Sequence, residues 1–330
     1  MNSKVKKNRM IAACAVIAVT LLLVHVTAYV HTGTCFAAET KPAVCESAEE
    51  AGDVLRDAMK ARKDSAGICL ITDVAASDSE GLMSQIFEEA TKHTGNAVEG
   101  DYIRFQYDNC QASAKPVSID GSSAVLFTYV ISYYDSSEQE KAVDEKVSEV
   151  MSGLGLEGRT DLEKTEIIYD YLRENVKYDY DNLADSENDL KRTAYSALVE
   201  GKAVCQGYSA ALYRLLLEAG VDNRIIFGAS PGIDGEDEDH TWNIVKIGEV
   251  YYNTDLTRDS ESGTAELFLK GSGPFDEDHM RSDEYLTEEF TSEYVISDTD
   301  FSAEGSSKPE RAGASVLDFR NIARGLFRKN

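Results

Sequence analysis

The apolar positions of the chain recur at helical spacing in some segments and at strand spacing in others. Apolar residues three and four apart, the spacing of an amphipathic helix, occur in segments 49–62, 82–90, 142–151 and 162–176. Alternating or continuous apolar residues, the pattern of a strand, occur in segments 67–72, 101–107, 124–134 and 224–228. Helices and strands are mixed along the chain, and the pattern predicts an α+β fold.

Two of the predicted helices follow a start signal. Ser77 and Glu80 precede the second segment, and Thr160 and Glu163 precede the fourth. Both pairs have the spacing of a capping box, in which the hydroxyl and the carboxylate satisfy two free N–H groups of the first turn. We therefore expect helices to begin at these two positions.

The first 38 residues have the pattern of an export signal. Four basic residues precede an uncharged run at 11–30, small residues follow, and no acid occurs before Glu39. A run of this length can also span a bilayer, so the alternative is an uncleaved membrane anchor at 11–30. Both interpretations predict an extracytoplasmic protein, secreted or anchored at the cell surface.

The remaining chain divides into three predicted regions. Residues 39–155 form a small N-terminal α+β region, in which we find no catalytic constellation. Residues 156–290 form a second domain, which holds the candidate catalytic residues described below. Residues 291–330 form a polar linker and a basic C-terminal tail, interpreted as a frayed terminus or, alternatively, as a tail that docks on the acidic body.

The net charge excludes one class of partner and favours another. Among 330 residues, 33 Lys and Arg stand against 59 Asp and Glu, a formal net charge of −26. Without the four basic residues of the leader, this charge becomes −30. Such a surface repels phosphate backbones, so we expect no nucleic-acid binding. Cationic, Lys-rich or amine-bearing partners are favoured instead.

The cysteines outside the leader offer disulfide candidates but no metal motif. Outside the cytoplasm, four cysteines can form two disulfides in three ways. Cys69 on one predicted strand and Cys110 just past another are a candidate pair. No CxxC motif or Cys/His cluster has metal-ligand spacing, and we expect no metal or organic cofactor. The four residues are Cys45, Cys69, Cys110 and Cys205.

Cys205 lies where a helix is predicted to begin. Apolar residues follow it at helical spacing as far as Ala219, and Gly220 provides a C-terminal stop. The positive end of a helix favours a thiolate over a thiol, and the free N–H groups of the first turn can donate to an oxyanion. Cys205 is therefore a candidate nucleophile, with a buried or disulfide-bonded cysteine as the alternative.

His240 and Asp255 lie on two predicted strands joined by a turn that contains Gly248. If Ile247 and Gly248 form a two-residue turn, the register sets His240 directly opposite Asp255 on one face. A carboxylate in that position can hold an imidazole in one tautomer and stabilise its cation. The alternative is an ordinary histidine at a loop edge and an aspartate in a turn.

Three segments in this order resemble the signature blocks of the transglutaminase-like superfamily: Gly201–Tyr208, His240–Asn243 and Tyr251–Thr257. The resemblance covers about residues 195–258. It implies a papain-like core and a Cys–His–Asp triad in a family of cross-linking transferases, peptidases and amidases. It assigns Cys205 as nucleophile, His240 as general base and Asp255 as the carboxylate that orients the base.

Two departures from the family pattern bear on the reaction. Arg258 stands where members often have Trp after Asp-x-Thr. Animal cross-linking enzymes have Gln before the nucleophile and Trp after it, whereas Val204 and Gln206 flank Cys205 here. The sequence therefore favours a cysteine-dependent enzyme that hydrolyses peptide or amide bonds. A cross-linking transglutaminase and a non-catalytic cell-surface binding module are the alternatives.

Five further residues are weighed as secondary candidates. Trp242 shares the predicted face of His240 and either lines the substrate site or fills the core. Gln206 and Tyr195 are weaker candidates for substrate binding. His93 and His279 have no sequence partners and are predicted to lie on the surface.

Two acidic runs, at 234–239 and 276–279, lack the spacing of an EF-hand loop and are interpreted as solvated loops rather than calcium sites. Acids that flank His240 favour its cation if the loop folds close to the imidazole.

Overall fold

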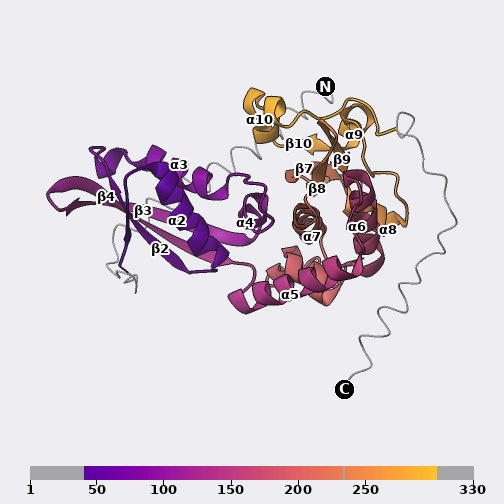
Figure 1. The fold of residues 1–330 in the computed structure, drawn as a ribbon, viewed down its shortest axis with the longest axis horizontal. Helices are drawn as coiled ribbons and strands as arrows, with labels where there is room; N and C mark the ends of the chain where they lie inside the picture. Colours follow the sequence, from indigo (N-terminus) through magenta and orange to yellow (C-terminus); the bar gives the residue numbers. More distant parts are fainter. Residues whose placement is uncertain (1–40, 233–234, 303–330) are drawn as a thin grey trace, which may run out of the picture.

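A computed structural model describes residues 41–232 and 235–302. The predicted leader, with its apolar run at 11–30, lies outside the described residues, and so does the basic tail from residue 303 onwards. Within the described ranges, no helix is long and apolar enough to cross a membrane. The described chain forms two units that lie beside each other (Figure 1).

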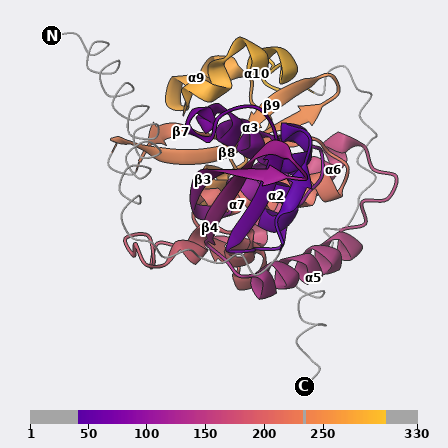
Figure 2. The same cartoon turned by 90° about the vertical axis from the view of Figure 1, so that its left-hand side faces the viewer.

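The N-terminal unit is a four-stranded sheet with helices on one face, and Figure 2 shows it in front of the second unit. The strand order is β1-β2-β4-β3, parallel between β1 and β2 and antiparallel elsewhere. Its elements are β1 (Ala43–Cys45), α2 (Ala48–Lys60), β2 (Ser65–Ile71), a 3₁₀ turn (Ala76–Asp78), α3 (Glu80–Thr91), α4 (Asp101–Arg104), β3 (Tyr107–Ile119) and β4 (Ser122–Tyr133).

The core of this unit lies between the sheet and the two longer helices. On β4, Val125, Phe127 and Tyr129 alternate inward and are buried, whereas Val130 on the opposite face is exposed. This alternation is typical of an antiparallel sheet with one covered face. The predicted strands at 67–72 and 124–134 are thus confirmed.

The structure contradicts two secondary-structure predictions in the N-terminal unit. Segment 101–107 was expected as a strand, but Asp101–Arg104 is a helical turn because the Asp101 carboxylate accepts from Arg224 and from the Ile225 backbone of the second unit. The expected Ser77–Glu80 capping box is absent. Ser79 is the N-cap of α3 and makes no side-chain cap bond, since its hydroxyl donates to the Ala76 carbonyl.

The second unit surrounds the buried helix α7 (Figure 1). The capping box at Thr160 and Glu163 is present at the start of α6, as predicted. The elements before the second sheet are α5 (Ser137–Gly153), α6 (Asp161–Asn175), β5 (Lys177–Tyr178), a 3₁₀ turn (Asp189–Arg192), a π-helical turn (Ser196–Glu200), β6 (Lys202–Ala203) and α7 (Cys205–Glu218).

One face of the second sheet packs on α7, where Asn243 of β8 donates to the Ser209 carbonyl. The strand order is β10-β7-β8-β9, all antiparallel. These and the remaining elements are β7 (Asn223–Pro231), β8 (Asp237–Ile247), β9 (Val250–Thr254), α8 (Leu256–Ser262), α9 (Ser272–Asp278), β10 (Met280–Arg281), a 3₁₀ turn (Asp283–Leu286) and α10 (Glu288–Glu293).

The boundaries between the units differ from the predicted ones. Val143 and Val147 of α5 belong to the hydrophobic cluster of the second unit, so the division lies before α5 rather than at 155. At the other end, Tyr294 is buried in the second unit and Phe301 packs against its core. Residues 291–302 are therefore part of the folded unit and not a linker, because their aromatic side chains find apolar partners there.

Buried polar contacts connect the two units. Both Asp101 oxygens accept from Arg224, at 2.7 and 2.9 Å, and the Arg224 guanidinium lies 4.3 Å from the Tyr294 ring centroid. His93, predicted to be exposed, is instead mostly buried between the Tyr213 hydroxyl and the Asp222 carboxylate. A buried charge is tolerated only with such a partner, so these contacts hold the units in a fixed orientation.

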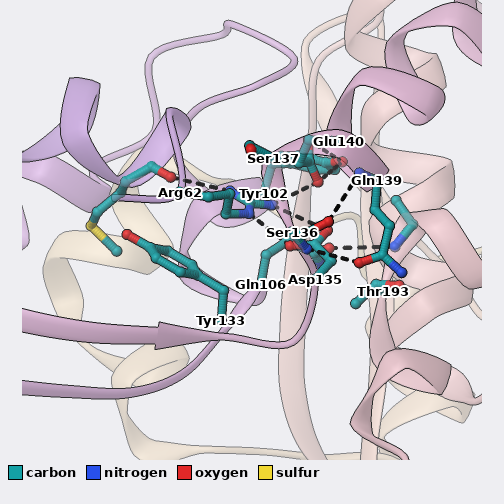
Figure 3. A network of polar contacts seen from close by, with 12 residues as sticks. Arg62, Tyr102, Gln106, Tyr133, Asp135, Ser136, Ser137, Gln139, Glu140 and Thr193 are labelled. Carbon is teal, nitrogen blue, oxygen red and sulfur yellow. Dashed lines mark hydrogen bonds and ion pairs between the residues drawn. The ribbon is translucent and has the colours of Figure 1, made fainter. Parts of the chain in front are cut away.

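A second buried cluster lies at the junction before α5 (Figure 3). Arg62 donates to Asp135 at 2.7 Å and to Glu140 at 2.6 Å, and Tyr102 donates to Glu140. Beside it, the Gln106 side chain accepts from the Ala194 backbone. The cluster thus joins α2, α4 and the start of α5 around two carboxylates and one guanidinium.

The raised pKa of Glu140 predicts a loss of stability as pH rises. Burial raises the pKa of Glu140 to about 8, opposed by Arg62 and reinforced by Asp135. A carboxyl whose pKa is raised on folding contributes stability below its unfolded pKa of about 4.3, and this stability is lost as pH rises through 8. Between pH 5 and 9, the free energy of unfolding should fall by on the order of 2 kcal/mol more in the wild type than in Glu140→Gln. Urea titrations measure this difference, and parallel pH curves would contradict it.

The proposed Cys69–Cys110 disulfide is not formed, since all four described cysteines are free. Cys69 lies opposite Leu126 of β4, and Cys110 lies opposite Ile131 of β4. Leu126 and Ile131 are five positions apart, so their side chains point to opposite faces of the sheet, and the two cysteines do the same. The sheet itself therefore separates the two thiols.

Candidate active site

Cys205 is the first residue of α7. The strand pairing of β5 with β6 holds the segment before it, and Val204 in extended conformation is the N-cap. The helix behind it is buried from Gly207 to Leu216, which fixes its direction. Cys205 itself remains partly exposed. The thiol therefore lies at the positive end of a rigid helix, as the sequence predicted.

The structure brings Cys205, His240 and Asp255 together. His240 Nε2 lies 2.8 Å from Asp255 Oδ2, and the imidazole also forms a hydrogen bond with the Cys205 thiol. His240 is 5% exposed and Asp255 is fully buried. Because Nε2 is occupied by the carboxylate, Nδ1 is the ring nitrogen that remains for the sulfur.

The register that forms this contact differs from the predicted one. Ile247 pairs with Val250, so the two-residue turn is Gly248–Glu249 and not Ile247–Gly248. The partner of each β8 residue thus moves by two positions, and Asp255 lies just beyond the end of β9. A shift of two residues leaves every side chain on its predicted face, because side chains of a strand alternate with period two. His240 and Asp255 therefore still meet.

The Asp255 carboxylate also begins a helix. Its Oδ1 accepts from the Arg258 backbone N–H at 3.1 Å, which makes Asp255 the N-cap of α8. The Arg258 guanidinium donates to the Ser230 hydroxyl at 2.8 Å, and its Nε lies 3.9 Å from Asp255 Oδ2. Arg258, at the position where the family often has Trp, thus ties α8 to the end of β7.

The electrostatics favour an ion pair between thiolate and imidazolium. Burial acts to raise the pKa of the Cys205 thiol, but the hydrogen bond and charge of His240 and hydrogen bonds from Thr241 outweigh it and lower this pKa. Burial acts to lower the pKa of His240, but the charge and hydrogen bond of Asp255 raise it to about 10. The lowered thiol pKa and the raised imidazole pKa together favour a Cys205 anion beside a His240 cation.

The Asp255 carboxylate is held ionised despite its burial. Burial acts to raise its pKa, yet the charge and hydrogen bond of His240, and then those of His279, lower this pKa well below the usual range. An ionised carboxylate only accepts hydrogen bonds, so each facing imidazole nitrogen carries a proton. Asp255 therefore fixes the tautomer of His240.

No feature of the sequence pattern indicates the position of His279. It was predicted to lie on the surface, but it is 3% exposed, and its Nε2 lies 3.0 Å from Asp255 Oδ2. Its ring stacks on Phe275, with 3.8 Å between centroids, and meets the edge of Trp242 at 5.2 Å. The polar composition beyond residue 259 concealed this contact, since only the folding of α9 and β10 beside β7 brings the ring to Asp255.

His240, Asp255 and His279 are also of the residue types that bind metal ions. They offer possible metal-ligand atoms within 4.8 Å of one another. This group was found among residues 41–232 and 235–302. Both Nε2 atoms, however, donate to the same carboxylate oxygen at hydrogen-bond distance. At these N···O distances the three residues form a hydrogen-bonded group.

The secondary candidates lie in different surroundings. Trp242 is 1% exposed, stacks near His240 with 6.2 Å between centroids and donates to Asn253, so it fills the core and cannot line a substrate site. Gln206 donates to the Phe105 carbonyl of the N-terminal unit at 2.6 Å. Tyr195 packs, partly buried, against the core around α7. Substrate binding by Gln206 and Tyr195 stays a prediction.

Residues 149–256 match the family model described as the transglutaminase-like superfamily. The matched segment contains the Cys205, His240 and Asp255 group. This part of the chain is therefore similar to the transglutaminase-like superfamily. A comparison with curated proteins gives no match.

Solved structures give distant similarities to this chain. One is described as a TGase, at 12% identity and a TM-score of 0.31 over 66% of this chain and 59% of that one. A proposed cysteine protease from Cytophaga hutchinsonii has 13% identity and a TM-score of 0.29 over 46% of this chain and 66% of that one. A proposed protease from Parabacteroides distasonis has 12% identity and a TM-score of 0.23, over 57% and 39%. The chain thus spans less than two thirds of the length of each.

Proposed function

We propose that the protein is a cysteine-dependent acyl-transfer enzyme with Cys205 as nucleophile, His240 as general acid and base, and Asp255 as the residue that orients His240. The observation that carries the proposal is the continuous hydrogen-bonded series from the thiol through the imidazole to a buried carboxylate. A partly exposed thiol with a lowered pKa is the microenvironment of a reactive cysteine.

The reaction follows from the charge state of the pair. The Cys205 thiolate attacks the carbonyl carbon of an amide, which forms a C–S bond and places a negative charge on the carbonyl oxygen. The His240 imidazolium then transfers its proton to the amide nitrogen, the C–N bond breaks, and an amine leaves. The resulting thioester is attacked by water or by another amine, whose proton passes to His240 as the thiolate departs.

Backbone N–H groups in the first turn of α7 are suited to bind the oxyanion. The first N–H groups of a helix have no intrahelical partner, and the helix dipole favours negative charge there. The N–H groups of Gly207 and Tyr208 donate to the Val204 carbonyl, so those of Cys205 and Gln206, at the start of α7, are the candidate donors. The same turn thereby stabilises both the thiolate and the developing alkoxide.

Hydrolysis of peptide or amide bonds is the proposed outcome. Transfer of the acyl group to an amine is the alternative, and an experiment must distinguish the two. Supporting hydrolysis, Val204 and Gln206 flank the nucleophile in place of the Gln and Trp of animal cross-linking enzymes. Gln206 is moreover engaged with the N-terminal unit through the Phe105 carbonyl.

A peptide library incubated with and without a primary amine, read by mass spectrometry, tests the proposal. Hydrolysis predicts cleaved or deamidated products in both incubations, whereas cross-linking activity predicts products that carry the added amine. Cys205→Ala is the matched control. No product in any incubation, together with an ordinary thiol pKa, would favour the non-catalytic binding module.

We further propose an extracytoplasmic location and a preference for cationic or amine-bearing peptide substrates. The basic and apolar residues of the leader support the location. The net charge supports the preference, and so do the exposed acids Asp237–Asp239, which precede His240 on β8. Faster cleavage of Lys-rich than of Glu-rich peptides at low salt is expected, and equal rates would contradict it. N-terminal sequencing of the exported protein distinguishes cleavage of the leader from anchoring.

A further inference from the structure

We infer that His279 is a positioning residue of the catalytic group: it holds the Asp255 carboxylate in the orientation that directs Oδ2 at His240. This inference rests on the proposed function. His279 comes from a segment beyond the matched residues 149–256, and nothing in the sequence pattern marked it. The geometry nevertheless makes it the second imidazole on the same carboxylate oxygen.

Three hydrogen-bond donors hold the Asp255 carboxylate. His240 and His279 donate to Oδ2 at 2.8 and 3.0 Å, and the Arg258 backbone donates to Oδ1 at 3.1 Å. Asp255 has no exposed surface, so water cannot replace a lost donor without a rearrangement. An oxygen that accepts two hydrogen bonds has both lone pairs directed, which leaves the side chain one orientation.

His279 is itself held rigidly. Its ring lies 3.8 Å from the Phe275 ring at an interplanar angle of 18°, and its Nδ1 lies 3.3 Å from the Phe275 carbonyl. The following strand, β10, is drawn close to β7 because Gly228 has no side chain: a Cβ there would lie 2.1 Å from the Met280 carbonyl oxygen. A glycine two strands away from Asp255 thus helps to place the ring.

The consequence for chemistry passes through His240. Residues that orient a reacting group through a hydrogen bond act on rate and on acid–base behaviour more than on substrate binding. Without the His279 donor, one lone pair of Oδ2 is unsatisfied, the orientation of the carboxylate is less firmly fixed, and its interaction with the His240 cation weakens. The thiolate of Cys205 then loses the cation that stabilises it.

The test measures the pH dependence of iodoacetamide alkylation at Cys205, followed peptide by peptide, because this readout needs no substrate. In His279→Phe, which keeps an aromatic ring but removes the donor, the thiol pKa should rise by about one unit or more. His279→Gln, which retains an N–H donor, should restore most of the shift. Turnover should fall about 10- to 100-fold in His279→Phe with little change in KM.

The matched control is His93→Phe, which removes the other buried imidazole bonded to a carboxylate, Asp222, away from Cys205. It should lower the melting temperature without moving the thiol pKa. An unchanged thiol pKa in folded His279→Phe would overturn the inference, and so would a profile altered by excess chelator, which would indicate a bound metal. If His279→Phe does not fold, the side-chain N–H resonance of His279 in ¹⁵N-labelled wild type provides the test. This resonance should shift when Cys205 is alkylated, and an unchanged resonance would overturn the inference.

Failure of the proposed function is separately visible. A wild-type Cys205 with an ordinary thiol pKa near 8.5 contradicts the proposed enzyme itself. A low wild-type value that His279→Phe leaves unchanged contradicts only the role of His279.

Discussion

Replacing Cys205 by serine is expected to abolish measurable amide cleavage, a loss of about 10³-fold or more, while the fold is retained. In the wild type, His240 stabilises the thiolate form of Cys205. A serine hydroxyl is far less acidic than a thiol, so the variant lacks an anionic nucleophile. The side chains are nearly equal in size, so α7 should keep its packing. Turnover of the peptides identified in the library assay measures the effect.

The wild-type thiol should also react at unusually low pH. Because His240 and Thr241 lower the pKa of Cys205, alkylation by iodoacetamide should already be rapid below pH 7. Cys110 serves as the internal control, since burial raises its pKa to about 12 and it should stay unmodified. Equal, slow alkylation of the Cys205 and Cys110 peptides at pH 7 would contradict the catalytic assignment.

Asp255→Asn should lower turnover by about 10²- to 10⁴-fold, the range expected when a triad carboxylate loses its charge. The carboxylate raises the pKa of His240 to about 10, and without it this pKa should fall towards 6.5. The thiolate–imidazolium pair, which in the wild type persists until pH approaches 10, should then be lost near neutral pH. The alkylation profile should show this as a thiol pKa closer to 8.5.

A stability measurement separates this role from a purely structural one. Asp222→Asn removes the other carboxylate that faces a buried imidazole, His93, at the contact between the units. It should lower the free energy of unfolding without changing the alkylation profile of Cys205. If both variants leave that profile unchanged, Asp255 does not act on the catalytic pair.

Local patterns were sufficient where neighbours in sequence decide the structure. The capping box at Thr160 and the apolar spacing after Cys205 predicted the starts of α6 and α7. The hairpin that carries His240 was predicted with a turn displaced by one position. The predicted contact between His240 and Asp255 still forms, because the resulting shift of two residues leaves each side chain on its predicted face.

Distant contacts decided the elements that were predicted wrongly. Segment 101–107 has an alternating pattern, yet Asp101 is fixed by Arg224, more than a hundred residues away, and its first turn is helical. Val143 of α5 was assigned to the N-terminal region because of its place in the chain, although its apolar partners lie in the second unit.

The sequence by itself determined the α+β class, the helix that carries Cys205 and the common face of His240 and Asp255, since periodicity and capping act over a few residues. Only the tertiary structure decided that Trp242 is core, that the two units share the buried Arg224–Asp101 ion pair, and that His279 reaches Asp255. The physical reason is burial: a polar side chain removed from water must find a partner, and the chain supplies that partner from wherever its packing brings one.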